Sequence, residues 1–245
     1  MALPTFARDF EYEYEGQTVT YTVVSEEDKT CVTKAARIYE ANNVLYADNK
    51  PFSGNLIIPS VAKDGVDEYS VIGVSDYSFF GTKLETISFP ESVTSIGEGA
   101  FMYCGDLTSL TIPESVTSIG VFAFAYCTGL TSLTIPKSVT SLEPYAFCYC
   151  FGLTSVYYGA KQLIKSEGSI FSGETYDSAT LYVTKESVSV AETLDPWQYF
   201  KKVEAYDFSG IEDVIADLDE IAPYEIFNLQ GRRVEKATRG HIYII

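Results

Sequence analysis

A 23-residue repeat fills the middle of this chain and limits the folds that are open to it. Three near-identical copies begin at Leu84, Leu107 and Leu130, and each ends its first half with P-x-S-V-T-S. Self-similarity at a fixed period of this length indicates a solenoid, in which each copy forms one coil stacked on its neighbours. The apolar surface within one copy is too small to offset the conformational entropy that 23 residues lose, so a single copy is not expected to fold alone.

Each copy begins with a short strand whose alternate side chains are apolar and point into the coil. A proline follows directly, and because it has no N–H to give to the neighbouring coil, it ends the strand. A second apolar pair, a glycine and an Ala-Phe pair on a brief helical turn complete the coil. In the central copy these positions are Leu107, Leu110, Ile112, Pro113, Val116, Ile119, Gly120, Ala123 and Phe124. The third copy has Glu143-Pro144 at the glycine position, so the turn there does not require a positive φ.

These residues resemble the BspA-like leucine-rich repeats of bacterial cell-surface proteins, whose pattern they follow as LxxLxIPxxVTSIGxxAFxxC. The resemblance implies an extracellular, non-catalytic binding or adhesion protein. The predicted fold is a leucine-rich repeat solenoid, a right-handed superhelix of short parallel strands with brief helical turns and a β-hairpin N-terminal cap.

Residues 1–52 are predicted to form the N-terminal cap region. Polar and apolar residues alternate from Asp9 to Val24 around Glu15-Gly16, which predicts an antiparallel hairpin that covers the open first coil. Further short strands are expected near Cys31 and near Val44.

The solenoid is predicted over residues 53–208, with an insertion in its first coil. Between Pro59 and Val71 lie nine more residues than the later copies have, and an Asp64-Gly65 turn within them predicts a projecting hairpin.

Beyond Gly152 the repeat loosens, as is typical of terminal coils. Phe171 takes the place of the repeat phenylalanine, and the last strand is expected at Leu181. Trp197, the only tryptophan, has two interpretations: a lid on the last coil, or an aromatic platform for sugars.

Residues 209–222 are predicted to be an acidic linker; a calcium loop is the rival interpretation, but the D-x-D-x-D-G spacing is absent. Residues 223–245 partly resemble the C-terminal sorting module of the same surface proteins. His241 interrupts the usual Gly-Ile-Tyr-Ile run of that module, so only a short, incomplete hairpin is expected there.

The chain carries 34 acidic and 17 basic residues, a formal charge of −17. Such a field repels phosphate backbones and anionic lipids, which argues against nucleic acid and membrane-surface partners. No apolar run reaches the roughly 20 residues that span a bilayer, so no direct membrane insertion is expected. The first residues lack the features of a signal peptide, which leaves a cytoplasmic protein or a mature form whose leader has been removed. The resemblance favours the second, and hence a secreted or cell-surface location.

Three of the five cysteines, Cys104, Cys127 and Cys150, occupy the same position of successive copies. One interpretation is a row of buried thiols that act as small apolar side chains. Disulfides fit poorly, because parallel Cβ vectors do not suit the geometry of the bond and three equivalent cysteines cannot all be paired. A metal site is the other alternative, but its ligands would have to converge on one point. No metal and no cofactor are predicted.

Catalysis is not predicted, because the residue inventory offers little for it. His241, the only histidine, is the fifth residue from the end of the sequence, and no phosphate loop or dinucleotide fingerprint is present. Paired carboxylates could hydrolyse a glycosidic bond, but Glu91 and Glu114 follow the proline turn and are expected on a solvated rim.

The outward side chains of the first strand in each coil are the predicted partner-binding face. Serine and threonine also suit any solvent-facing strand, so the composition alone does not distinguish a binding face from a plain surface. The expected partner is an extracellular or host-surface protein, bound weakly and multivalently by a monomer; a carbohydrate-binding accessory module and a passive stalk are the alternatives. The candidate residues are Thr86, Ser88, Thr108, Ser109, Thr111, Thr131, Ser132, Thr134, Thr154, Ser155, Tyr157 and Tyr158.

Overall fold

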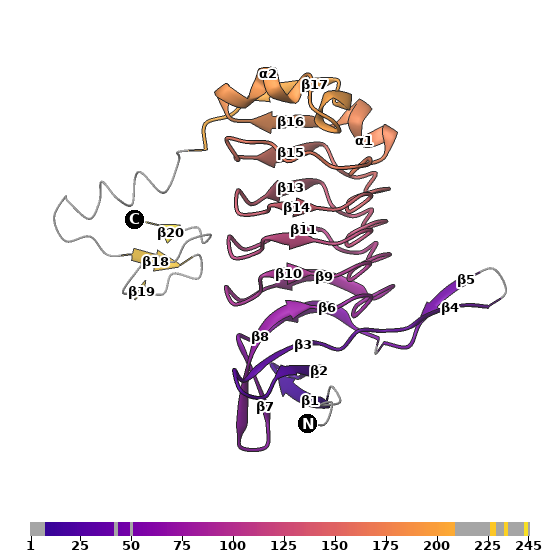
Figure 1. Ribbon diagram of the computed structural model, residues 1–245, viewed down its shortest axis with the longest axis vertical. Helices are drawn as coiled ribbons and strands as arrows, with labels where there is room; N and C mark the ends of the chain where they lie inside the picture. The colour runs from indigo at the N-terminus through magenta and orange to yellow at the C-terminus, as the bar shows by residue number, and fades with distance from the viewer. Residues whose placement is uncertain are drawn as a thin grey trace, which may run out of the picture. The chain divides into compact units, whose positions relative to one another are not determined.

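A computed structural model describes residues 8–41, 44–49 and 51–208, together with the strand residues 226–228, 233–234 and 243–244. The chain divides into two compact units, residues 1–205 and 206–245. In the first unit the coils lie one above another, from the N-terminal strands to two short helices at the opposite end (Figure 1). The predicted leucine-rich repeat solenoid is confirmed.

An antiparallel hairpin opens the first unit, as the alternating sequence predicts. It consists of β1 (Asp9–Tyr14) and β2 (Gln17–Ser25), and β3 (Thr30–Thr33) continues the sheet antiparallel to β2. Strand β3 then pairs in parallel with β8 (Asp67–Val74) of the first coil, so the hairpin covers the end of that sheet. The predicted boundary at residue 53, between the cap region and the solenoid, therefore remains a prediction.

Two further hairpins lie near this end. β4 (Ile38–Ala41) pairs antiparallel with β5 (Val44–Ala47). β7 (Val61–Asp64) pairs antiparallel with β8 around Gly65, which confirms the hairpin predicted for the insertion.

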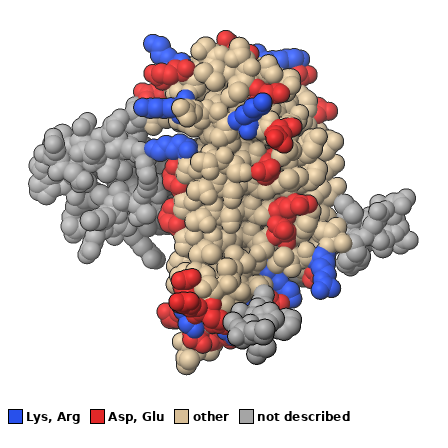
Figure 2. All heavy atoms as spheres, in the orientation of Figure 1, with Lys and Arg blue, Asp and Glu red and all other residues tan. Residues whose placement is uncertain are grey.

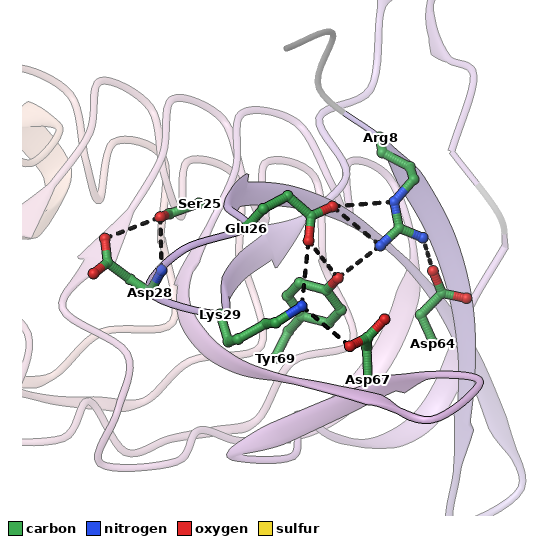
Figure 3. Close-up of polar contacts among 8 residues, drawn as sticks. All are labelled: Arg8, Ser25, Glu26, Asp28, Lys29, Asp64, Asp67 and Tyr69. Atoms are coloured by element: carbon green, nitrogen blue, oxygen red, sulfur yellow. Dashed lines mark hydrogen bonds and ion pairs between the residues drawn. The ribbon is translucent and has the colours of Figure 1, made fainter.

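Charged side chains join the N-terminal hairpin to the inserted one (Figure 3). Arg8 pairs with Glu26 at 3.2 Å and also with Asp64. Lys29 Nζ lies 3.5 Å from Glu26 and 5.0 Å from the centre of the Tyr69 ring. Tyr69 is fully buried beneath these groups, so the network fixes the turn after β2 against the first coil.

Each regular coil contributes a strand to each of two sides of the solenoid. The parallel register advances by 23 residues per coil, as in the pairs Ser95 with Ser118 and Ser118 with Ser141. On the first side lie β6 (Ser53–Ile57), β9 (Lys83–Ser88), β11 (Ser109–Leu110), β13 (Ser132–Ile135), β15 (Ser155–Tyr158), β16 (Thr180–Val183) and β17 (Lys202–Ala205). On the second side β8 is followed by β10 (Ser95–Ile96), β12 (Ser118–Ile119) and β14 (Ser141–Leu142).

Hydrogen-bonded turns, rather than regular helices, form the third side of the central coils. Their backbones bond from coil to coil, with Phe101 N donating to Ala123 O at 2.8 Å and Tyr103 N donating to Ala125 O at 2.8 Å. Just before these turns Gly97 and Gly120 lie in contact with the neighbouring coil. A Cβ on Gly120 would lie 2.7 Å from the backbone carbon of Gly97, so close approach, not a positive φ, requires glycine there.

The apolar positions of the repeat form rows of buried side chains along the axis. The repeat phenylalanines stack at 5.2 Å from Phe79 through Phe101 and Phe124 to Phe147. Leu84, Leu107 and Leu130 are fully buried in successive coils, as the period predicts. These rows make up one continuous core.

The three repeat cysteines are free, buried thiols, as predicted for a thiol row. Each Sγ donates to the phenylalanine carbonyl of the preceding coil, for example Cys127 to Phe101 O at 3.3 Å and Cys150 to Phe124 O at 3.1 Å. Burial raises the pKa of Cys104 to about 11 and that of Cys150 to about 12, so these thiols stay protonated.

The last coil is closed by α1 (Gly173–Ser178), η1 (Lys185–Ser187), α2 (Val188–Ala191) and η2 (Trp197–Tyr199). Trp197 is fully buried, packs 5.1 Å from the Tyr158 ring, and donates from Nε1 to Ile164 O at 2.7 Å. The lid interpretation is thus confirmed, and no face of Trp197 is left for a sugar. The expectation that Leu181 begins the last strand was wrong, because β17 adds a further parallel strand beside β16.

The second unit contains β18 (Ile226–Asn228), flanked by β19 (Arg233–Val234) and β20 (Tyr243–Ile244), all antiparallel. Its likeness to a sorting module remains a prediction. The predicted acidic linker and His241 lie outside the described residues.

Candidate interaction surface

The strands on the first side place the predicted partner-binding residues in rows. Ser132 lies beside Ser155, which lies beside Thr180, and Lys202 completes this row. Thr86 and Ser109 are partners in the same way nearer the N-terminus. We call the outward residues of β9, β11, β13, β15, β16 and β17 the strand face.

Eleven of the twelve predicted residues are at least partly exposed, and one is not. Seven of the eleven lie in strands of the strand face, whereas Thr108, Thr111, Thr131 and Thr154 lie directly before or after a strand. Tyr158 is fully buried, which corrects its assignment to the binding face. Neighbouring residues of a strand point to opposite sides, and Tyr158 pairs with the inward Ile135, whereas Tyr157 points outward. Tyr158 therefore belongs to the core beneath the lid.

Several of the predicted hydroxyl groups already hold neighbouring coils together. Thr108 Oγ1 donates to Glu85 O at 3.3 Å, and Thr154 Oγ1 donates to Thr131 O at 3.1 Å. Thr86 Oγ1 donates to the Asn55 side chain at 2.8 Å. These threonines stabilise the stack, which weakens their assignment to a partner.

The strand face changes character toward its C-terminal end. Tyr157 and Tyr182 are register partners whose rings stack at 4.7 Å, and both are partly exposed. Exposed Lys202 and Glu204 lie on the next strand, with Glu204 beside Tyr182. Aromatic rings beside charged groups of both signs suit protein recognition better than the hydroxyl rows do.

A second surface feature, on the third side, was missed by the sequence-based reasoning. Tyr103, Tyr126 and Tyr149 occur two residues after the repeat phenylalanine in each copy, and their rings stack at 4.4 Å per step. Phe80 packs edge-on against Tyr103 at 5.4 Å, and Phe151 against Tyr149 at 5.7 Å. We call these five side chains the aromatic ladder. The 23-residue spacing of its tyrosines was the signal that could have found it.

The central ladder tyrosine, Tyr126, is neutral at physiological pH. Burial, together with the adjoining Tyr103 and Tyr149, raises the pKa of Tyr126 to about 12. Tyr103 is 40% exposed and Tyr149 is 38% exposed, so hydroxyl groups and ring edges reach solvent along the ladder.

A cavity of about 280 Å³ lies between the N-terminal cap and the first coil. Much of its polar lining is already paired: Thr33 Oγ1 lies 2.8 Å from Ser78 Oγ, and Asn49 donates to Phe80 O at 3.0 Å. Among the described residues, no cluster of three or more histidine, cysteine or carboxylate side chains could hold a metal ion.

The sequence of residues 68–190, half of the chain, matches the family model described as the BspA type leucine-rich repeat region, in six copies. The chain belongs to this family. Membership indicates a non-catalytic role in protein interaction for this BspA-type protein. A search of curated proteins finds no match.

Several solved structures are similar to this BspA-type protein. A leucine-rich repeat protein from Bacteroides capillosus is 28% identical with a TM-score of 0.45, over 57% of this chain and 93% of that one. A leucine-rich cell surface protein from Faecalibacterium prausnitzii is 21% identical with a TM-score of 0.42, over 71% of this chain and 54% of that one. The pneumococcal vaccine antigen PcpA is 15% identical with a TM-score of 0.47, over 75% of this chain and 49% of that one. The BspA-type chain thus spans about half the length of the last two.

Within the described part of the chain, none of the helices has the length and apolar character needed to cross a bilayer.

Proposed function

We propose that this chain is a secreted or cell-surface adhesion protein that binds a host or matrix protein through its strand face. Family membership supports a non-catalytic interaction role, and the Faecalibacterium protein of similar structure is described as a cell surface protein. The observation that carries the proposal is the stacked pair Tyr157–Tyr182 beside Lys202 and Glu204.

The composition of the strand face sets the kind of binding to expect. Tyrosine supplies contact area at low conformational cost and is frequent among residues that dominate binding energy, whereas serine and threonine are not. We therefore expect Tyr157 and Tyr182 to contribute most of the binding energy. The surrounding rows of serine and threonine are expected to contribute little. Single contacts of this kind are weak, so attachment by many monomers displayed on one surface is the expected mode.

Binding of the intact chain to immobilised matrix proteins, measured beside a glycan array, tests this proposal. Saturable binding to a matrix protein is expected, and the double variant Tyr157→Ser/Tyr182→Ser should lose about tenfold or more in affinity. Tyr199→Ser is the matched control, because Tyr199 is 49% exposed but belongs to the lid rather than to the strand face.

Other outcomes would favour the alternatives. Binding to glycans alone would support a carbohydrate-binding accessory module. Absence of saturable binding to either panel would support a passive stalk. If the double variant binds the matrix protein as tightly as the wild-type chain does, the strand face is not the binding surface.

A further inference from the structure

The aromatic ladder is a continuous surface that is separate from the strand face. Its three tyrosine rings lie on the turns of the third side and stack along the solenoid axis at 4.4 Å per step, with the buried Phe80 packed against one end and Phe151 against the other. Phe151 is 52% exposed, more than Tyr103 or Tyr149.

The fold itself does not require tyrosine at these positions. Tyr103, Tyr126 and Tyr149 have φ values of 64°, 62° and 59°, a left-handed conformation that favours glycine. In the first coil the equivalent residue is Gly81, with φ 66°, and its N donates to the next coil just as Tyr103 N does. Glycine adopts this left-handed conformation without strain. Backbone geometry therefore does not explain why the later coils have tyrosine at this position, which points to a role for the tyrosine side chains.

The ladder presents ring edges and hydroxyl groups, not ring faces. Its tyrosines cover one another at 4.4 Å with interplanar angles of 17° and 23°, and the terminal rings close the stack at 72° and 66°. A sugar needs an open ring face, so this arrangement does not suit carbohydrate stacking. Phenolic oxygens can accept hydrogen bonds from the N–H groups of arginine or lysine.

Acidic residues outnumber basic ones in the coils that carry the ladder tyrosines. Residues 84–136 contain no lysine, arginine or histidine. The middle coils on the face drawn in Figure 2 carry acidic side chains, whereas basic ones gather toward the two ends. Asp106 is exposed three residues after Tyr103, and the exposed Lys83 holds the equivalent position one coil earlier.

From this geometry we propose that the aromatic ladder binds an extended, positively charged peptide segment of a partner protein. The tyrosine edges supply apolar contact, their hydroxyl groups accept hydrogen bonds, and the excess of acidic side chains on these coils, Asp106 among them, attracts the cationic side chains. A second copy of this chain is disfavoured as the occupant, because two molecules of charge −17 repel each other.

Selection of a displayed library of random 12-residue peptides on the intact, folded chain tests the proposal. The enriched peptides are expected to be rich in arginine and lysine. Their affinity, measured by fluorescence anisotropy, should fall about tenfold or more for the triple variant Tyr103→Ser/Tyr126→Ser/Tyr149→Ser. Circular dichroism checks the fold of the variant.

Two further variants keep the test decisive if the triple variant misfolds. Asp106→Asn leaves every ring in place and should weaken binding and reduce its salt dependence. Tyr157→Ser, on the strand face, should leave peptide affinity unchanged, so failure of this proposal is distinguishable from failure of the adhesion proposal. Enrichment without basic residues, failure to enrich any peptide, or equal binding by the triple variant would overturn the proposal.

Discussion

The Tyr69 hydroxyl donates a hydrogen bond of 2.7 Å to Glu26 Oε2 and accepts one of 2.7 Å from Arg8 (Figure 3). Glu26 lies in the turn after β2, and Tyr69 lies in β8, so this contact joins the N-terminal cap to the first coil. The Tyr69 hydrogen bond, together with Arg8 and Lys29, holds the pKa of Glu26 below its ordinary 4.5.

This lowered pKa predicts that acid weakens the cap. A carboxylate whose pKa is lower in the folded state stabilises that state above its unfolded pKa and ceases to do so as the pH falls through the folded value. Hydrogen exchange in β1 and β2 should therefore accelerate, relative to the central coils, as the pH falls below about 4.5.

Glu26→Gln should reduce this extra acid sensitivity, leaving the part due to Asp9 of β1, whose pKa is also lowered by its hydrogen bond with Thr22. Glu27→Gln, which changes an exposed neighbouring carboxylate, should not reduce it. Identical pH profiles for the wild-type chain and Glu26→Gln would show that the contact with Tyr69 does not govern the cap.

Contact between coils predicts that Gly120 does not tolerate a side chain. Its Cβ would lie 2.7 Å from Gly97 C and from Glu98 N, which are backbone atoms that cannot rotate away. Gly120→Ala should lower the free energy of unfolding by about 1–3 kcal/mol in urea titrations, because neighbouring coils must separate.

Gly173→Ala is the matched control, since a Cβ there would meet nothing within 4 Å. That change should shift stability by less than about 1 kcal/mol. Equal destabilisation by the two substitutions would mean that lost backbone freedom, not steric contact, sets the cost.

Much of the first unit could be predicted because a solenoid translates sequence period directly into spatial neighbours. The stacked Phe101 and Phe124, the buried thiol of Cys127 and the strand-ending prolines all follow from positions 23 residues apart. The same logic located the hairpin at Gly65, because extra residues must leave the core register at an edge.

The errors occurred where the period alone carries too little information. Tyr157 and Tyr158 are both large, and only the strand register decides that the second points inward. The tyrosines of the aromatic ladder recur visibly in the sequence, but neither a strand nor a helix period applies to turns with positive φ, so their exposure could not be read from the pattern. β17 follows the lid without a repeat signature and was missed for that reason.

The buried thiol row predicts slow cysteine chemistry. Burial raises the pKa of Cys127 well above its ordinary 9.0, and its neighbours Cys104 and Cys150 add to the effect. Because the thiolate is the reactive form, a thiol reagent at pH 8 should modify the folded chain slowly, at a rate set by local opening.

Unfolding in urea should expose all five cysteines to rapid modification. Mass spectrometry of partly modified protein should place Cys127 among the last residues to react. Fast labelling of Cys127 in the folded chain would contradict the packing of the thiol row.

The lid predicts a loss of stability that is local to one end. Trp197 is fully buried, and its Nε1 donates 2.7 Å to Ile164 O, so Trp197→Ala would leave both a cavity and an unpaired carbonyl. The expected cost is about 3–5 kcal/mol. Because each coil contacts only its neighbours, this cost should appear as faster hydrogen exchange in β15 and β16, while β10 and β12 keep their protection.

Tyr199→Ala, which changes an exposed lid residue, should alter neither pair of strands by a comparable amount. Uniform loss of protection along the solenoid would instead indicate that the coils unfold as a single cooperative unit.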